Sequence, residues 1–254
     1  MEEVEATRES STPTIISLVV HAPDAPAPQT LRFACDWDVG IGGSVWTSGQ
    51  VLAGHLQQHA DKYRPLFAGK CVLELGSGTG FVGLMTAVCF APARVLLTDL
   101  ATHVASLERN VALNAALLPP STRVRVAELS WGSAEQEDAL LASLGDGADT
   151  VDTVDVIIGT DVAYLHELYE PLLHSLRRLA GEQTLVLLGL NRADTDTAFF
   201  TRLEQDGFEY YKVPDEQLHR DYHGKDFGLF EIRRGGDGRT PRYFGGRGVA
   251  ASAE

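Results

Sequence analysis

The stretch VLELGSGTGFVGL, from Val72 to Leu84, joins one apolar run to another through three alternating glycines. This pattern predicts a strand that ends at Leu75, a tight turn, and a helix that begins near Gly80. Glycines at such a junction let the backbone approach a ligand closely, and the free N–H groups of the helix N-terminus face the same place. The segment therefore predicts a ligand site at the end of a strand.

Apolar strands and amphipathic helices alternate regularly from Lys70 onward. Strands are predicted at 71–75, 94–99, 123–129, 154–161 and 184–190, and helices at 80–90, 102–117, 165–179 and 193–205. Val/Ile/Leu-rich strands separated by helices indicate a parallel sheet covered on both faces. Two last strands, 208–214 and 227–234, have no helix between them and must pair antiparallel. We predict an α/β fold: a doubly wound, Rossmann-like sheet of seven strands that ends in an antiparallel hairpin.

The regions that flank this pattern differ in composition. Strand-like runs at 14–20 and 30–38 enclose the turn-rich HAPDAPAPQ and predict an N-terminal β-hairpin. A helix follows Val45, with Thr47 or Ser48 as its expected cap. The last twenty residues are rich in Gly and Arg and predict disorder. We divide the chain into a polar segment with a β-hairpin extension (1–44), the main domain (45–234) and a disordered tail (235–254).

Composition excludes several classes of partner. The net charge of −14, from 35 acidic and 21 basic residues, disfavours nucleic acid. The acidic start MEEVEATRESSTPT is unlike a signal peptide, and IISLVV is too short to span a bilayer. Three cysteines without CxxC spacing suit a reducing compartment and are expected in the core. We expect a cytoplasmic monomer that binds neither nucleic acid nor membrane.

The glycine turn has two possible ligands. Residues 78–83 satisfy the letters of GxGxxG, and Asp99 follows about 20 residues later, as in nicotinamide-dinucleotide sites. The register differs, however, because the first glycine after the strand is Gly76, and Phe81 stands where the third glycine would belong. Glu74 would also repel a pyrophosphate. A cationic ligand without phosphate, S-adenosylmethionine, fits better.

Four segments resemble one enzyme family. ELGSGTG, at 74–80, resembles motif I of class I (seven-strand) methyltransferases, which use S-adenosylmethionine. DVAY, at 161–164, matches the D-x-x-Y motif of the methyltransferase-like protein lysine methyltransferases. VWTSGQVL and ELSWG are similar to two tryptophan segments of that group, in the same order and spacing. The four segments cover Val45 to about Leu173, so the resemblance is specific.

The resemblance implies a role for particular residues. Glu74 and Trp46 would bind the methionine end of the cofactor, Asp99 the ribose hydroxyls, and Trp131 the adenine. The full set of implied cofactor contacts is Trp46, Glu74, Gly76, Ser77, Gly78, Asp99, Leu100, Trp131 and Thr160. The alternative for each tryptophan is a buried core residue, since large aromatics dominate cores.

Asp161 and Tyr164 are the implied catalytic residues. A lysine amine has a pKa near 10.4, so exposing its lone pair at pH 7 costs about 4 to 5 kcal/mol. Asp161 would hold the ammonium, and Tyr164 would line the lysine channel. The sequence leaves open which group accepts the proton. The ordinary alternatives are a helix N-cap for Asp161 and a helix-start aromatic for Tyr164.

The resemblance implies a protein-lysine N-methyltransferase that acts on a non-histone protein. GGSVWTSGQVL and FFTRLEQDGFEY are most similar to fungal enzymes that modify translation elongation factor 1A, while relatives that modify Hsp70-type chaperones are nearly as similar. A small-molecule methyltransferase, a catalytically silent binding module and a dehydrogenase are the alternatives.

Two other features are assigned no catalytic role. The histidine pairs in HLQQH and HRDYH lack a third ligand nearby, so no metal is expected. The segment 134–155 holds seven acids and no base, and we expect a solvated loop and helix there. A minor hypothesis is that these acids orient a basic substrate.

Overall fold

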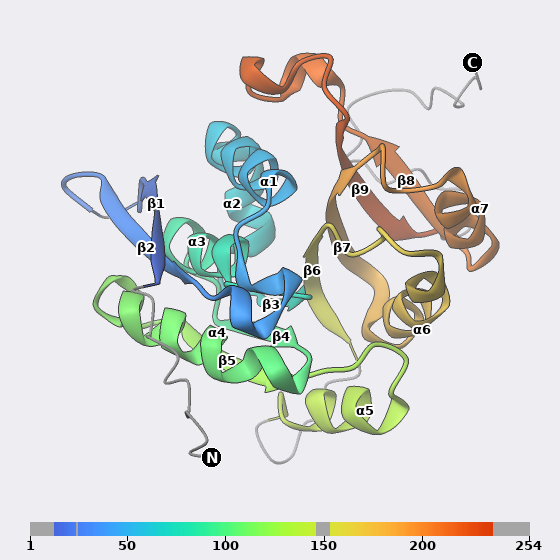
Figure 1. The fold of residues 1–254 in the computed structure, drawn as a ribbon, viewed down its shortest axis with the longest axis horizontal. Coiled ribbons are helices and arrows are strands. Elements are labelled where there is room, and N and C mark those ends of the chain that lie inside the picture. The colour runs from blue at the N-terminus through green and yellow to red at the C-terminus, as the bar shows by residue number, and fades with distance from the viewer. Residues whose placement is uncertain (1–12, 24, 146–152, 236–254) are drawn as a thin grey trace, which may run out of the picture.

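The computed structural model describes residues 13–23, 25–145 and 153–235, and its centre is one seven-stranded sheet (Figure 1). The strands run in the order β5-β4-β3-β6-β7-β9-β8. Their bounds are β3 (Cys71–Leu75), β4 (Arg94–Asp99), β5 (Arg123–Glu128), β6 (Val154–Thr160), β7 (Ala180–Asn191), β8 (Phe208–Lys212) and β9 (Phe227–Arg234). Strands from β5 to β7 pair in parallel, and β9 is antiparallel to both β7 and β8. The predicted doubly wound sheet with a terminal hairpin is confirmed.

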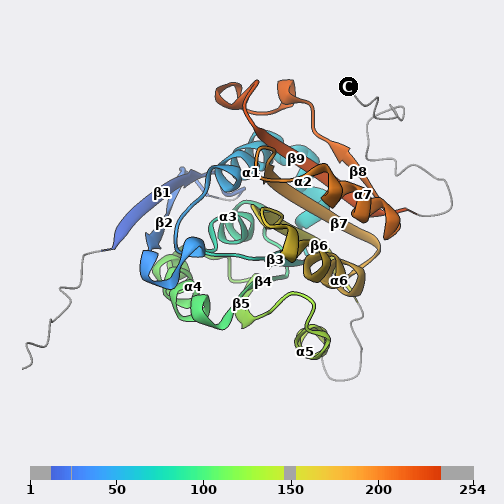
Figure 2. The same cartoon turned by 45° about the vertical axis from the view of Figure 1, so that its right-hand side comes forward.

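Helices cover both faces of the sheet because its strands carry apolar side chains on both. Val72 packs in one core cluster, with residues of α1 (Thr47–Gln58), α2 (Ala60–Phe67), α3 (Phe81–Phe90) and α4 (Ala101–Asn114). Leu73 and Leu75 point the other way and pack with α5 (Ala134–Ala142), α6 (Tyr169–Leu179) and α7 (Thr197–Gln205). Figure 2 shows α5 and α6 on the opposite side of the sheet from α1 and α3.

The N-terminal hairpin is joined to the domain through asparagine side chains. Strands β1 (Thr14–Val20) and β2 (Gln29–Cys35) pair antiparallel, as predicted. Asn110 and Asn114 of α4 each accept a hydrogen bond from a backbone N–H of β2, at Ala34 and Arg32, and donate one to the carbonyl of the same residue. The open edge of β2 is thereby satisfied without another strand. The proposed boundary between extension and domain stays a prediction.

Several element boundaries differ from the prediction. Strand β2 ends at Cys35, because the Asp36 side chain accepts a hydrogen bond from the N–H of Asp38 and starts the 3₁₀ turn Trp37–Val39. The N-cap of α1 is Trp46, so the predicted cap at Thr47 or Ser48 is wrong. Helix α5 lies within the acidic segment. The tail prediction for 235–254 falls, apart from Gly235, outside the described residues.

The topology fixes where a ligand binds. Strand β3 lies between β4 and β6, and the chain order of the sheet reverses there. In open α/β sheets the crevice at the carboxyl ends of the strands on either side of such a point is the ligand site. The glycine turn after Leu75 opens into this crevice.

Candidate functional site

A pocket of about 940 Å³ lies at the carboxyl ends of β3, β4 and β6. This volume is near the upper end of the roughly 300–1,000 Å³ of small-molecule sites. The pocket is lined by every site residue that the sequence predicts: Trp46, Glu74, Gly76, Ser77, Gly78, Asp99, Leu100, Trp131, Thr160, Asp161 and Tyr164. Residues from widely separated parts of the chain therefore meet at one place.

The glycine turn is held in a left-handed conformation. Gly76, Gly78 and Gly80 have φ angles of 60°, 54° and 76°, which favour glycine. Ser77 fixes the turn to β4, since its N–H donates to the Thr98 carbonyl and its Oγ accepts from the Thr98 N–H, each at 2.9 Å. Two hydrogen bonds therefore hold the turn against the end of β4.

Gly78 also meets the segment that precedes α1. A Cβ at Gly78 would lie 2.6 Å from the carbonyl oxygen of Gly42, so no side chain fits between the two backbones. We expect Gly78→Ala to cost about 1–3 kcal/mol of folding free energy and to weaken cofactor binding by about tenfold or more, because the turn must move. Thermal unfolding and calorimetry would measure the two effects.

Gly54→Ala in α1 is the matched control for this prediction. Nothing lies within 4 Å of a Cβ built at Gly54, so this variant is expected to keep or gain stability. Equal behaviour of the two variants would contradict the close packing at Gly78.

Glu74 is a buried carboxylate at the end of β3. It lies on the same face of the strand as Val72, toward α3, where Gly83 leaves room for it: a Cβ at Gly83 would be 2.5 Å from Glu74 Oε2. The residue is 3% exposed, and Oε2 has no hydrogen-bond partner. Burial raises the pKa of Glu74 to about 8, although the Ser77 hydroxyl and the backbone N–H groups of Gly83 and Val82 lower it in part. A cation bound beside this carboxylate would supply the missing partner.

Asp99 is the last residue of β4, and its side chain is hydrogen-bonded to the glycine turn. Its Oδ2 accepts a hydrogen bond of 2.7 Å from the N–H of Gly78, and Oδ1 accepts one of 2.8 Å from the N–H of Leu100. His103 follows one helical turn later, with Nδ1 3.4 Å from Asp99 Oδ1. The His103 Nε2 is buried without a hydrogen-bond partner, under Gly42. The carboxylate is held at the pocket wall with spare acceptor capacity for a hydroxyl.

Apolar side chains form the wall beside Asp99. Leu100 is 50% exposed although it is large and apolar. The partly buried ring of Trp131 lies against the turn, with Cζ2 3.1 Å from where a Cβ of Gly76 would be. An exposed leucine and a tryptophan edge near a carboxylate suit a flat heterocycle joined to a ribose.

Trp46 is the N-cap residue of α1 and lines the pocket. It is 42% exposed and donates a hydrogen bond of 2.9 Å from Nε1 to the Ile41 carbonyl. The alternative of a buried core residue is therefore wrong for Trp46. Thr160 is the last residue of β6 and is partly buried. Its Oγ1 lies 3.6 Å from the position that a Cβ on Gly49 would take.

Asp161 follows β6 in a left-handed conformation, with φ of 52°. Its Oδ1 accepts a hydrogen bond of 2.7 Å from Ser48 Oγ and one of 3.3 Å from the N–H of Asn191. Burial raises the pKa of Asp161 above its usual range. The N-cap alternative is wrong, because the next helical turn begins at His166 with Leu165 as its cap. No helix begins at Asp161, and the residue lines the pocket.

Tyr164 lies in the irregular segment between β6 and the 3₁₀ turn His166–Leu168, so it is not a helix-start residue. Its side chain is partly buried and lines the pocket with Asp161. An acid and a phenol thus line the same pocket.

Other lining residues were not predicted as site residues. Ser48 has a side chain typical of helix caps, and His103, Asn191 and Asp194 lie in stretches without a motif. Asp194 accepts a hydrogen bond of 2.6 Å from the Asn191 side chain and raises the pKa of Asp161. A weak signal for Asp194 was its place just beyond the end of a strand.

The charges of the pocket-lining residues indicate which cofactor fits the pocket. The described lining residues include five carboxylates, Glu74, Asp99, Asp161, Glu167 and Asp194, and no lysine or arginine. A pyrophosphate would meet repulsion on every side. S-adenosylmethionine carries an ammonium and a sulfonium but no phosphate, and the unpartnered Glu74 Oε2 suits such a group. The residues fit S-adenosylmethionine better than a dinucleotide.

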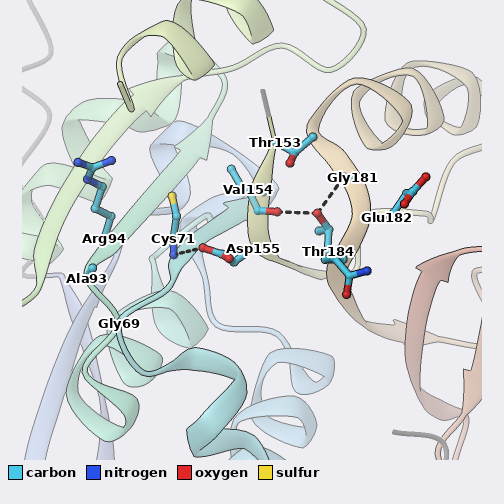
Figure 3. A pocket seen from close by; sticks show the side chains of 11 residues that line it. Gly69, Cys71, Ala93, Arg94, Thr153, Val154, Asp155, Gly181, Glu182 and Thr184 are labelled. Carbon is cyan, nitrogen blue, oxygen red and sulfur yellow. Dashed lines mark hydrogen bonds between the residues drawn. The ribbon is translucent and has the colours of Figure 1, made fainter. Parts of the chain in front are cut away.

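A second cavity, of about 550 Å³, lies at the amino ends of the strands, away from the predicted site residues (Figure 3). It is bordered by Cys71 and Asp155, and the Asp155 carboxylate accepts a hydrogen bond of 2.8 Å from the Cys71 N–H. Burial raises the pKa of the Cys71 thiol to about 11, so the thiol stays protonated. We assign this cavity no chemistry.

Within residues 13–23, 25–145 and 153–235 no three His, Cys, Asp or Glu side chains cluster so as to hold a metal ion. None of the helices in these ranges has the length and apolar character needed to cross a bilayer. The HLQQH histidines instead share the Gln217 carbonyl, with His55 Nδ1 at 3.1 Å and His59 Nε2 at 3.0 Å.

Comparison with known proteins gives consistent matches. A family model described as lysine methyltransferase matches residues 26–206. Protein N-lysine methyltransferase METTL21A of Mus musculus is 32% identical over 200 residues, which are 76% of this chain and 82% of the mouse protein. EEF1A lysine methyltransferase 3 of Xenopus tropicalis is 30% identical over 151 residues, 59% of this chain and 58% of the frog protein. Precorrin-6y C5,15-methyltransferase of Geobacter metallireducens shares the fold, with a TM-score of 0.51 at 14% identity over 80% of this chain and 94% of that one.

Proposed function

The chain belongs to the lysine methyltransferase family, and from this membership we propose that it transfers a methyl group from S-adenosylmethionine to a lysine side chain of another protein. One observation carries the cofactor part of the proposal. The pocket at the glycine turn holds five carboxylates and, among the described residues, no lysine or arginine, and one carboxylate oxygen is buried without a partner. Such a pocket favours a cation and disfavours phosphate.

Each part of the cofactor has a proposed contact. Glu74 and Trp46 bind the methionine end, Asp99 binds the ribose hydroxyls, and Trp131 with Leu100 covers the adenine. The remaining contacts are Gly76, Ser77 and Gly78 in the turn and Thr160 at the end of β6. The assignment is supported by the sheet topology, because Asp99 ends β4, Trp131 lies in the loop after β5, and these two strands are neighbours in the sheet.

The bound cofactor supplies an activated methyl group, and the protein aligns the lysine amine with it. Asp161 accepts a hydrogen bond from the incoming ammonium through Oδ2, because Oδ1 is already bonded to Ser48. Tyr164 lines the lysine channel and offers its ring face to the cation. The carboxylate thus sets the position of the amine next to the methyl group.

Exposed apolar residues at the pocket mouth favour a protein substrate over a small molecule. Ile41, Trp46, Leu100 and Leu165 are 40% exposed or more and line the pocket. Trp37 is 62% exposed and packs edge to face with Trp46, with ring centroids 6.3 Å apart. Large apolar side chains gathered at a mouth are typical of surfaces that bind proteins.

We expect Trp37→Ala to raise KM for the protein substrate by about tenfold, since interface tryptophans commonly contribute more than 1 kcal/mol. The affinity for S-adenosylhomocysteine should stay unchanged, because Trp37 does not line the pocket. Tyr211→Ala, at an exposed aromatic on β8, is the control and should leave both values unchanged. An unchanged KM for the Trp37 variant would contradict this docking surface.

Calorimetry with S-adenosylhomocysteine and with NAD tests the cofactor. We expect binding of the former alone, and tight NAD binding without it would overturn the proposal in favour of a dehydrogenase. The relatives named EEF1A lysine methyltransferase 3 support elongation factor 1A as the first substrate to test, with an Hsp70-type chaperone as the second. Mass spectrometry after incubation with cofactor and each protein would locate methylated lysines.

Two alternative functions of this pocket would give different experimental results. Cofactor binding without methylation of any protein in a lysate would indicate a silent binding module, and methylation of small molecules alone would indicate a small-molecule enzyme. We also propose that the protein works in the cytoplasm, since its three cysteines are free thiols.

A further inference from the structure

Glu137 is a buried acid in a segment that the sequence presents as solvated. It lies on α5, in the stretch of seven acids without a base, yet the residue is 0% exposed. The expectation of a solvated helix is wrong at this position. A buried carboxylate is costly unless other groups bond to it, so its partners indicate what it does.

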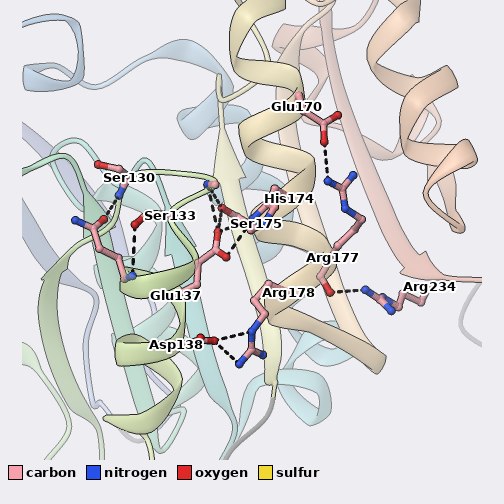
Figure 4. Close-up of polar contacts among 12 residues, drawn as sticks. Ser130, Ser133, Glu137, Asp138, Glu170, His174, Ser175, Arg177, Arg178 and Arg234 are labelled. Atoms are coloured by element: carbon pink, nitrogen blue, oxygen red, sulfur yellow. Dashed lines mark hydrogen bonds and ion pairs between the residues drawn. The ribbon is translucent and has the colours of Figure 1, made fainter.

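Two elements provide those partners (Figure 4). Glu137 Oε1 accepts a hydrogen bond of 2.6 Å from Ser175 Oγ and one of 3.2 Å from the backbone N–H of Gly132. His174 Nδ1 forms a further hydrogen-bond contact of 3.3 Å with Oε1 and lies 3.2 Å from Oε2, which makes no hydrogen bond itself. The Gly132 N–H also lies 3.0 Å from Ser175 Oγ. Glu137 therefore ties α6 to the backbone directly after Trp131.

The other side of Trp131 is held by the residue next to Glu137. Gln136 Oε1 accepts a hydrogen bond of 2.6 Å from the N–H of Ser130, and its amide donates to Glu128 at 3.0 Å. Gly132 has φ of 79° and packs so closely on Pro171 that an added Cβ would lie 3.3 Å from the proline Cα. The loop 130–132 is thus fixed at both ends of the tryptophan.

We propose that Glu137, with Ser175 and His174, is a positioning group for Trp131 and thereby sets the affinity for the cofactor adenine. The buried carboxylate fixes the Gly132 N–H, and this fixes the backbone from which the Trp131 ring reaches the glycine turn. The proposal rests on the proposed function, in which Trp131 contacts the adenine. Glu137 touches neither cofactor nor substrate, since it does not line the pocket.

Glu137→Ala should raise KM for S-adenosylmethionine, and Kd for S-adenosylhomocysteine, about tenfold, while kcat at saturating cofactor stays within twofold. Such a split is typical of a lost contact that is equally strong in ground and transition states. Glu137→Gln keeps the acceptor oxygen for Gly132 and should raise KM only about threefold. Glu135→Gln, at an exposed acid of the same helix, is the control and should change nothing.

A second readout does not depend on activity. The chain has three tryptophans, so the Trp37→Phe/Trp46→Phe background leaves Trp131 as the only one. In that background Glu137→Ala should increase acrylamide quenching of Trp131 fluorescence without cofactor. If Glu137→Ala does not fold, Ser175→Ala, which removes one acceptor of the Gly132 N–H, should show the same increase to a smaller extent.

The results separate this proposal from the proposed function. Unchanged quenching and unchanged KM in the folded Glu137 and Ser175 variants would overturn the positioning role. Failure of the unmodified protein to bind S-adenosylhomocysteine would overturn the proposed function, and the quenching difference would still establish that Glu137 positions Trp131.

Discussion

Replacing Asp161 with asparagine is expected to lower kcat for protein methylation about 100-fold or more, in the range of a lost proton-handling or charge-binding group. Asparagine tolerates the left-handed φ of 52°, and its amide oxygen can still accept the hydrogen bond from Ser48. The variant therefore keeps the shape of the site and removes only its charge. Single-turnover assays at saturating cofactor, together with S-adenosylhomocysteine calorimetry, would separate the loss of catalysis from the unchanged cofactor affinity.

The pH dependence of kcat provides a second test of the role of Asp161. Burial raises the pKa of Asp161, so the carboxylate is protonated at higher pH than an ordinary aspartate. If the ionised form holds the lysine ammonium, kcat must rise as pH increases through that pKa, and the asparagine variant must lack this rise. A smaller effect, of a few-fold, is expected for Ser48→Ala, which removes one hydrogen bond and keeps the charge. Wild-type kcat in the Asp161 variant would exclude Asp161 as the group that holds the amine.

The fold could be predicted because its signals are local. Continuous apolar strands such as 71–75 and 184–190 alternate with helices, and the absence of a helix between 208–214 and 227–234 dictates an antiparallel pair. The glycine turn could also be predicted, because each of its three left-handed positions favours glycine and the sequence has glycine at all three. Boundaries were less accurate where side chains decide them, as at Asp36, whose carboxylate ends β2.

The pocket residues that sequence reasoning missed owe their roles to distant contacts. Ser48 has a capping-type side chain, but its partner is Asp161, 113 residues away. Gly42 closes over Gly78 from the segment before α1, and nothing in its neighbours in sequence indicates this. Glu137 shares its composition with solvated acids around it and differs only because α6 packs against it. Such pairs are set by tertiary packing, which no local pattern encodes.

Glu74→Gln should weaken S-adenosylhomocysteine binding by about 100-fold or more, since removing one member of a buried charge pair commonly costs 3–5 kcal/mol. Glutamine has nearly the same shape, so the loss isolates the charge that we propose to bind the cofactor ammonium. Because burial raises the pKa of Glu74 to about 8 and a bound cation favours the ionised form, wild-type affinity should fall as pH decreases below about 8. Calorimetry between pH 6 and 9 would measure both effects, and pH-independent binding would contradict the ion pair.

The same substitution should stabilise the free protein. A carboxyl whose pKa is higher in the folded state than its ordinary value of 4.5 makes unfolding easier as pH rises from that value, until the folded pKa of about 8 is passed. At 1.36 kcal/mol per pKa unit, the cost at pH 9 is on the order of a few kcal/mol, and Glu74→Gln removes it. Denaturant unfolding without cofactor should therefore favour the variant at pH 9 and show little difference near pH 4. Asp99→Asn is the control: its carboxylate accepts two backbone hydrogen bonds, so this variant should lose cofactor affinity without gaining stability. A Glu74→Gln protein less stable than wild type at pH 9 would mean that the carboxylate is already paired in the free protein, and the cofactor would then have no unpaired charge to bind.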